Sequence, residues 1–158
     1  MRLMRVVLIS LILVVSFLSL SSSAQVPTPF ETPQAITVEE ARGFLDEYVA
    51  RYKKMDIDAF MALFSKEVRE NRMLPYADIY EIYRKYFFNS DSLAYNVQVY
   101  SIQPFARSAF VSGRYEVIQS LKPKGQQNIF RGNIQWNLVR EDGSLKIREI
   151  DYGRDRER

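Results

Sequence analysis

The hydrophobic pattern of this chain changes its period once, at residues 89–91, and that change restricts the architectures open to it. Before this point apolar residues recur every three to four positions, which is the spacing of amphipathic helices. After it they alternate with polar residues, as in strands that bury one face. The composition, with 47% hydrophobic and 26% charged residues, is that of a globular protein. Helices followed by strands predict an α+β domain.

Three helices are expected before the change of period. Thr37 and Glu40 have the spacing of a capping box at the start of the first helix. Asp56 can cap a short second helix that ends before a turn at residues 65–66. Pro75 suits the first turn of the third helix. The expected helices span residues 38–54, 57–64 and 75–88.

Long strands are expected after the change of period. In the last of them Ile147 and Ile150 are out of phase by one residue, so a β-bulge near residues 148–149 is needed to turn both inward. Gly143 suits a hairpin turn before that strand. Together the elements predict three N-terminal helices packed on a strongly curved antiparallel β-sheet, forming a cone with a pocket at its open end. The expected strands span residues 68–72, 93–99, 109–117, 130–138 and 145–152.

The N-terminus has the pattern of a secretory signal peptide. Arg2 and Arg5 precede an apolar stretch at residues 6–20, and a run of small residues ends at Ala24. This stretch is shorter than the roughly 20 residues that span a bilayer, so we expect no stable membrane anchor after cleavage. The expected location is periplasmic or secreted. The predicted segments are a signal peptide at 1–24, a Pro-rich flexible tether at 25–35, one domain at 36–152 and a charged, frayed tail at 153–158.

Charge and residue types exclude several classes of function. The chain has 22 Lys and Arg against 19 Asp and Glu, and removal of residues 1–24 leaves a net charge of +1. A nearly neutral protein lacks the clustered basic face that nucleic-acid binding requires. Cys and His are absent, which leaves no ligands for the usual zinc or iron sites and no Cys–His or Ser–His pair. We therefore expect no metal, no cofactor and no nucleic-acid partner.

Four stretches carry a recognisable pattern of residue spacing and type: residues 44–52, 55–65, 109–115 and 132–138. Through these stretches the chain resembles the nuclear transport factor 2-like, or SnoaL-like, superfamily of cystatin-like α+β barrels, and an exported bacterial member in particular. The resemblance covers about residues 36–152. It implies the cone fold. Because the superfamily includes isomerases, dehydratases, cyclases, transport factors and non-catalytic binding or assembly domains, it implies no single reaction.

The resemblance also bears on catalysis. SnoaL-like cyclases place a His or Asp in the cone, and this chain has no His. Ketosteroid-isomerase-like members use an Asp base with a Tyr and a second acid, and no inward Asp here matches that base by position. We therefore expect no evident catalytic residue. Glu70 and Tyr115 remain as the alternatives for an isomerase- or dehydratase-type enzyme that pairs a carboxylate with a tyrosine.

Aromatic side chains from two helices and two strands are expected to form the pocket. Their polar tips would orient a flat or amphipathic ligand, although core packing is the simpler role for any one of them, and for Phe64 above all. Of Glu70 and Asn71, alternation allows only one to face inward, and a solvent-exposed sheet edge is the simpler expectation for both. The predicted pocket residues are Tyr48, Tyr52, Phe64, Asn71, Tyr83, Tyr115 and Trp136.

The polar face of the strand at residues 130–138 is expected on the outside of the sheet. In the resembled superfamily this face often packs against a second subunit, which implies a homodimer. Three functions stay open: an exported non-catalytic domain that binds a small apolar or aromatic ligand or a protein partner, an isomerase- or dehydratase-type enzyme, and a cell-envelope assembly module. We favour the first, because the chain lacks His and offers a set of aromatic residues for the cone. The residues of the predicted dimer face are Arg131, Asn133, Gln135 and Asn137.

Overall fold

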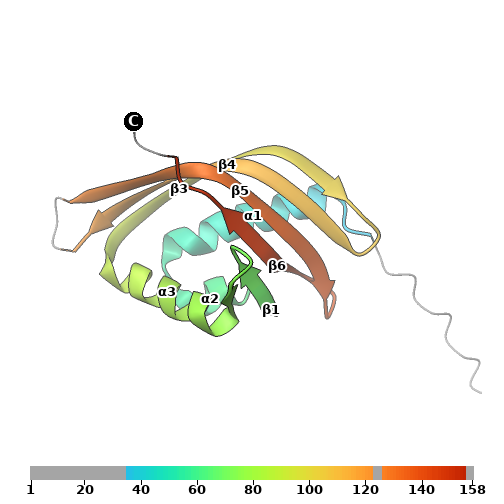
Figure 1. Ribbon diagram of the computed structural model, residues 1–158, viewed down its shortest axis with the longest axis horizontal. Coiled ribbons are helices and arrows are strands. Elements are labelled where there is room, and N and C mark those ends of the chain that lie inside the picture. Colours follow the sequence, from blue (N-terminus) through green and yellow to red (C-terminus); the bar gives the residue numbers. More distant parts are fainter. Residues whose placement is uncertain (1–34, 123–125, 156–158) are drawn as a thin grey trace, which may run out of the picture. The chain divides into compact units, whose positions relative to one another are not determined.

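The computed structural model describes residues 35–122 and 126–155. The predicted signal peptide, the predicted tether apart from Ala35, and the last three residues of the predicted tail lie outside them. Figure 1 shows the helices on one side of a curved sheet. Among the described residues, no helix combines the length and apolar character needed to cross a membrane. The elements are α1 (Val38–Lys54), α2 (Ile57–Met61), β1 (Phe64–Glu70), β2 (Leu74–Pro75), α3 (Tyr76–Asn89), β3 (Ser90–Pro104), β4 (Ser108–Leu121), β5 (Gln127–Glu141) and β6 (Ser144–Tyr152).

Helix α1 begins at the expected capping box. The Thr37 hydroxyl accepts a hydrogen bond from the Glu40 amide at 3.1 Å, and a Glu40 carboxylate oxygen accepts one from the Thr37 amide at 2.8 Å. The other carboxylate oxygen of Glu40 accepts a hydrogen bond from Arg140 of β5 at 2.7 Å, which ties the start of the helix to the sheet. Met55 ends the helix in a left-handed conformation, with φ of 57°. The predicted bounds of this helix are confirmed.

Helix α2 is shorter than the sequence predicts. Asp56 caps it as expected, but the helix ends at Met61. Phe64 already belongs to β1 and is paired with Ile147 of β6. Backbone pairing with β6 takes the place of another helical turn, so the predicted extension of the helix to Phe64 is wrong. Helix α3 lies one residue later than expected, with Pro75 just before it.

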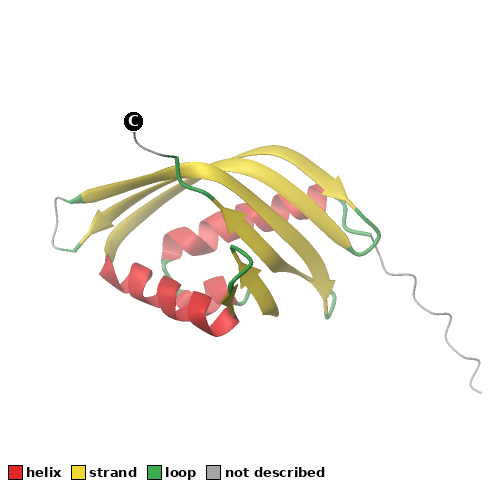
Figure 2. Cartoon of the chain, in the orientation of Figure 1, coloured by secondary structure: helices red, strands yellow, loops and turns green. Residues whose placement is uncertain are grey.

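The six strands form one open, curved sheet in the order β2-β1-β6-β5-β4-β3. Figure 2 shows the helices, in red, beneath the arch of the strands. Neighbouring strands are antiparallel except β1 and β6, which run parallel. A parallel pair needs a long connection, and the chain between these two strands supplies it by forming α3 and three long strands. The predicted α+β fold is confirmed, with this one parallel pair added.

Strand β6 carries the expected β-bulge. Asn137 of β5 pairs with Glu149, and the next residue of β5 pairs with Ile147, so Arg148 is the extra residue. Both Ile147 and Ile150 are fully buried as a result. The bulge therefore lets a strand with two out-of-phase apolar sets bury both of them.

Aromatic residues dominate the core between the helices and the sheet. Phe60 and Trp136 are fully buried, and Tyr48 of α1 contacts both, with ring centroids 5.2 and 5.9 Å away. The contact between Tyr48 and Trp136 is edge-to-face, a favoured geometry for aromatic pairs. Tyr48 therefore joins the core to the cavity described below.

The chain beyond β6 stays on the sheet. The Gly153 amide donates a hydrogen bond to the Asn133 carbonyl at 3.1 Å, and the Asp155 amide donates one to the Arg131 carbonyl at 2.8 Å. The expectation of a frayed tail is therefore wrong for the C-terminal segment, by which we mean residues 153–155. Backbone hydrogen bonds to β5 hold it where the sequence offers no apolar anchor.

Candidate functional site

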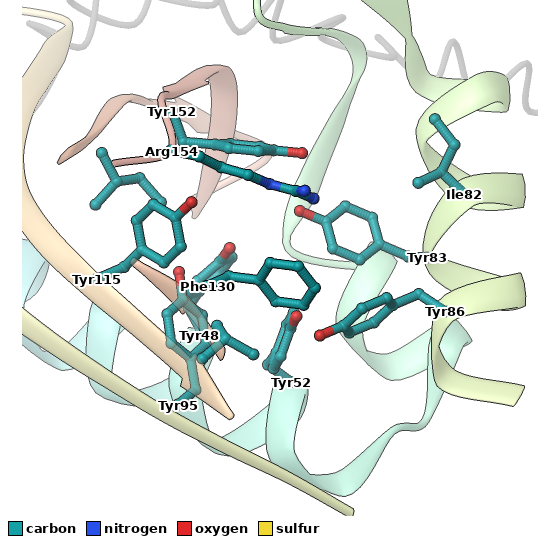
Figure 3. Close-up of a pocket in the computed structure, with 12 residues that line it drawn as sticks. Tyr48, Tyr52, Ile82, Tyr83, Tyr86, Tyr95, Tyr115, Phe130, Tyr152 and Arg154 are labelled. Atoms are coloured by element: carbon teal, nitrogen blue, oxygen red, sulfur yellow. The ribbon is translucent and has the colours of Figure 1, made fainter. Parts of the chain in front are cut away.

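A cavity of about 130 Å³ lies between helices α1 and α3 and the inner face of the sheet. Seven of the ten tyrosines of the chain line it, and they come from both helices and from three strands. Figure 3 shows tyrosines entering this space from several sides with their hydroxyl groups at the inner ends. The lining residues are Tyr48, Tyr52, Ile82, Tyr83, Tyr86, Tyr95, Tyr115, Val117, Phe130, Ile134, Tyr152 and Arg154.

Helical spacing explains why α1 and α3 each contribute two tyrosines. Tyr48 and Tyr52 are four residues apart, and Tyr83 and Tyr86 are three apart, so each pair shares one face of its helix. The Tyr52 ring contacts rings from other elements, with centroid distances of 4.7 Å to Tyr95 and 6.2 Å to Tyr83. Because each ring packs against its neighbours, the positions of the hydroxyls are fixed before any ligand arrives.

Burial keeps these hydroxyls protonated. Removal from water raises the pKa of each of the seven cavity tyrosines above the ordinary value of 10, and it is the largest influence on each of these pKa values. The pKa of Tyr48 is raised far above the ordinary value, because its side chain is almost wholly enclosed. The cavity therefore presents neutral hydroxyls, each able to donate and to accept a hydrogen bond.

Glu70 lies behind the wall of the cavity. It is 1% exposed, at the end of β1, and Tyr152 donates a hydrogen bond to its Oε1 at 2.7 Å. Its Oε2 has no hydrogen-bond partner among the described residues. Burial raises the pKa of Glu70, and the hydroxyls of Tyr152 and Tyr83 oppose that rise. The expectation of a solvent-exposed edge is wrong for Glu70, because β2 and β6 flank β1 on both sides.

Asn71 positions the end of β6 and lies outside the cavity. It follows β1 in a left-handed conformation, with φ of 48°, which asparagine adopts more readily than most residues. Its side-chain oxygen accepts a hydrogen bond from the Tyr152 amide at 2.9 Å, and its own amide donates to the Ile150 carbonyl at 2.9 Å. Asn71 thus holds the backbone of Tyr152 in place, and the Tyr152 hydroxyl bonds to the carboxylate of Glu70, the residue before Asn71.

The structure divides the predicted pocket residues into two groups. Phe64 and Trp136 are core residues that pack against Tyr48, with centroid distances of 6.4 and 5.9 Å, and Asn71 lies at the turn described above. Tyr115 is at the cavity, and its hydroxyl donates a 3.3 Å hydrogen bond to the Gly153 carbonyl. The predicted pocket residues that line the cavity are Tyr48, Tyr52, Tyr83 and Tyr115.

Eight lining residues were not predicted as part of the pocket. For most of them the sequence pattern indicates an inward-facing side chain, because they lie on the apolar stripe of α3 or at inward positions of the expected strands. Alternation shows which strand residues face inward, but it does not show which of them lie level with the cavity. Arg154 carried no signal, since backbone hydrogen bonds of its neighbours place it there. The eight are Ile82, Tyr86, Tyr95, Val117, Phe130, Ile134, Tyr152 and Arg154.

The polar residues of β5 face away from the helices. Arg131, Asn133 and Gln135 are exposed, while Asn137 is partly buried. Arg131 forms an ion pair with Glu116 on the neighbouring strand β4. Their use as a dimer face stays a prediction. Within residues 35–122 and 126–155, no three acidic side chains come together as metal ligands.

No protein-family profile and no curated protein matches this sequence. Solved structures do match it. A nuclear transport factor 2-like superfamily protein from Salmonella enterica serovar Typhimurium has a TM-score of 0.65 and 15% identity, over 75% of this chain and 91% of that one. A ketosteroid isomerase-like protein from Erwinia carotovora atroseptica has a TM-score of 0.59 and 17% identity, over 75% and 98%.

A candidate scytalone dehydratase from Novosphingobium aromaticivorans has a TM-score of 0.64 and 11% identity, over 75% of this chain and 83% of that one. Identities this low carry information on architecture alone. In this chain three helices pack against a curved, mostly antiparallel sheet, and a cavity lies between them. The fold that the resemblance implied has the same arrangement. The chain therefore has the nuclear transport factor 2-like fold.

Proposed function

We propose that this domain binds a small ring-containing molecule in the tyrosine-lined cavity. The observation that carries the proposal is the set of seven tyrosines around an internal space of about 130 Å³. Their aromatic faces offer apolar contact, and their protonated hydroxyls offer hydrogen bonds at fixed positions. Binding of this kind needs no catalytic residue, in keeping with a chain that has neither His nor Cys.

The volume of the cavity sets the size of the ligand. An engineered protein cavity of roughly 150 Å³ holds one benzene molecule. A cavity of about 130 Å³ therefore suits a single aromatic ring. Any larger part of a ligand would extend past the exposed lining residues, which are Ile82, with 45% of its surface exposed, and Arg154. The proposed ligand class is thus one planar ring with a few polar substituents.

Benzyl alcohol tests the proposal, because it joins one ring to one neutral hydroxyl. Titration into the protein, followed by two-dimensional NMR, is expected to shift amide signals around the cavity, with a dissociation constant at or below the millimolar range. The variant Ile82→Trp adds an indole at the exposed rim without altering the core, and it should weaken binding severalfold. Met73→Trp adds the same group at a position that is 76% exposed and does not line the cavity, so it should bind like wild type.

Two results would contradict this proposal. One is the absence of any binding of ring compounds to the wild-type protein. The other is unchanged binding in Ile82→Trp, which would mean that the ring binds at a site other than this cavity.

A proton-transfer enzyme is the second candidate function, and one contact supports it. Glu70 is a buried carboxylic acid with a raised pKa, and it is hydrogen-bonded to Tyr152, whose ring lines the cavity. In its ionised form Glu70 could accept the hydroxyl proton of Tyr152 while the Tyr152 oxygen takes a proton from a carbon of a bound ketone, and the reverse transfer would return a proton at another carbon. The matching assay is the conversion of a β,γ-unsaturated cyclohexenone to its conjugated isomer. Activity that disappears in Glu70→Gln would support the enzyme, and equal rates with and without protein would exclude this reaction.

Export from the cytoplasm is part of the proposal and is supported by the sequence pattern of residues 1–24. Two arginines, an apolar stretch and small residues before Gln25 are the supporting features. Expression of the full chain in a bacterial host, followed by fractionation and intact mass measurement, tests it. The expected product begins at Gln25 and is found in the periplasm or the medium. An uncleaved chain in the cytoplasm would contradict export.

A further inference from the structure

Arg154 is the only charged residue among the twelve that line the cavity. Its guanidinium lies 4.4 Å from the centre of the Phe130 ring, which lines the same space. Figure 3 shows the Arg154 side chain extending among the cavity tyrosines. A single positive charge at a site otherwise made of rings and neutral hydroxyls is a strong constraint on the charge of a ligand.

The backbone of the C-terminal segment fixes the position of Arg154. Hydrogen bonds from the amides of Gly153 and Asp155 to β5 hold the residues on both sides of it, and Asp155 forms an ion pair with Arg114. Gly132 of β5 leaves room for this arrangement, since a Cβ there would collide with the Gly153 carbonyl. Arg154 thus reaches the cavity from an anchored backbone, although the side chain itself is exposed.

The charge of Arg154 is not neutralised by a described residue. The adjacent acid, Asp155, is paired with Arg114. Arg154 forms no ion pair within residues 35–122 and 126–155. Its positive charge lowers the pKa of Tyr86, Tyr115 and Tyr152 against the effect of burial, which places the guanidinium within electrostatic reach of three cavity hydroxyls.

The geometry points to an aromatic carboxylate as the ligand, with its ring among the tyrosines and its carboxylate paired to the Arg154 guanidinium. This inference rests on the proposed ring-binding function and adds the charge of the ligand. Arginine suits a carboxylate because its planar group can donate two parallel hydrogen bonds. Arg154 would then be the residue that determines specificity, while the tyrosines supply the contact with the ring.

Three probes separate the parts of this inference. Benzoate carries a ring and a carboxylate, benzyl alcohol a ring without charge, and acetate a carboxylate without a ring. Each is titrated by NMR into the full protein and into Arg154→Gln. The matched control is Arg107→Gln, which makes the same change of charge at an exposed turn between β3 and β4, away from the cavity.

Wild-type protein is expected to bind benzoate about tenfold more tightly than benzyl alcohol, and acetate far more weakly than either. Arg154→Gln should lose about tenfold in affinity for benzoate and keep its affinity for benzyl alcohol. Arg107→Gln should match wild type with all three probes. Benzoate binding should also weaken as salt is raised, because the guanidinium is exposed.

The ways to fail are distinguishable. If benzyl alcohol binds as well as benzoate, and Arg154→Gln binds both like wild type, the inference is overturned and the ring-binding function stands. If no ring compound binds, both are overturned. An equal loss of benzoate binding in Arg107→Gln would show a general charge effect and would also overturn the role of Arg154.

Discussion

Tyr152 donates a 2.7 Å hydrogen bond to the carboxylate of Glu70, and the two residues lie on β6 and β1, the one parallel pair of strands in the sheet. The hydroxyl that completes this bond belongs to a ring that lines the cavity, whereas the carboxylate does not line it. A buried acid is thus connected to the cavity through one tyrosine. A substitution of Glu70 or of Tyr152 should therefore have a measurable effect on the other residue.

The first prediction concerns Glu70 and pH. Burial raises the pKa of Glu70 in the folded protein above its ordinary value of 4.5, so the folded state holds this proton more tightly than the unfolded state. The stabilisation linked to this group is complete below pH 4.5 and is lost as pH rises through the folded-state pKa. Glu70→Gln should remove that loss, so its free energy of unfolding should fall less than that of wild type over the same pH range. Urea unfolding at several pH values measures this, and parallel curves for the two proteins would contradict it.

The second prediction concerns the donor to Glu70. Tyr152→Phe leaves the buried carboxylate without its 2.7 Å hydrogen bond and should cost about 1–3 kcal/mol of stability at neutral pH. Tyr115→Phe is the matched control, because it removes one hydroxyl from the same cavity and only a 3.3 Å hydrogen bond. The control should cost less. Equal losses in the two variants would show that the Glu70 contact has no special weight.

The third prediction concerns the ionisation of tyrosine. The pKa of all seven cavity tyrosines is raised by burial, so these residues should stay protonated at pH values where tyrosine in an unfolded chain ionises, near 10. Ultraviolet absorbance at increasing pH measures phenolate directly, with the protein in urea as the control. The folded protein should show a large part of its phenolate signal only on alkaline unfolding. A single titration with the same midpoint as the unfolded control would contradict the burial of these rings.

The fourth prediction concerns two glycines. Gly132→Ala places a methyl group against the Gly153 carbonyl, so it should cost about 1–3 kcal/mol and release the C-terminal segment. Faster hydrogen exchange at the Asp155 amide would report that release. Gly43→Ala is the control, because a Cβ there meets nothing within 4 Å on an exposed face of α1, and it should gain about 0.5–1 kcal/mol. A stable Gly132→Ala with a protected Asp155 amide would contradict the proposed packing.

Much of the fold could be predicted because its signals are local. The capping box of Thr37 and Glu40 marks the start of α1, and the phase change between Ile147 and Ile150 marks the bulge. Phe64 was assigned to the wrong element because its pairing with Ile147 joins residues far apart in the sequence. Local periodicity contains no information about a strand partner that is distant in the sequence.

The candidate site was less predictable, for two physical reasons. Tyr95 and Tyr152 could be seen to face inward, but sheet curvature decides which inward residues meet at the cavity. Glu70 was expected at an exposed edge, and the two-residue strand β2 covers that edge. Arg154 is held by backbone hydrogen bonds of its neighbours, which any sequence can make.

The wall of the cavity takes residues from Tyr48 on the first helix to Arg154 after the last strand. A nascent chain in which β6 and Arg154 have not yet been made therefore lacks part of the cavity wall. The proposed ligand binding would therefore require a chain folded through Arg154, and a fragment that lacks β6 should not bind.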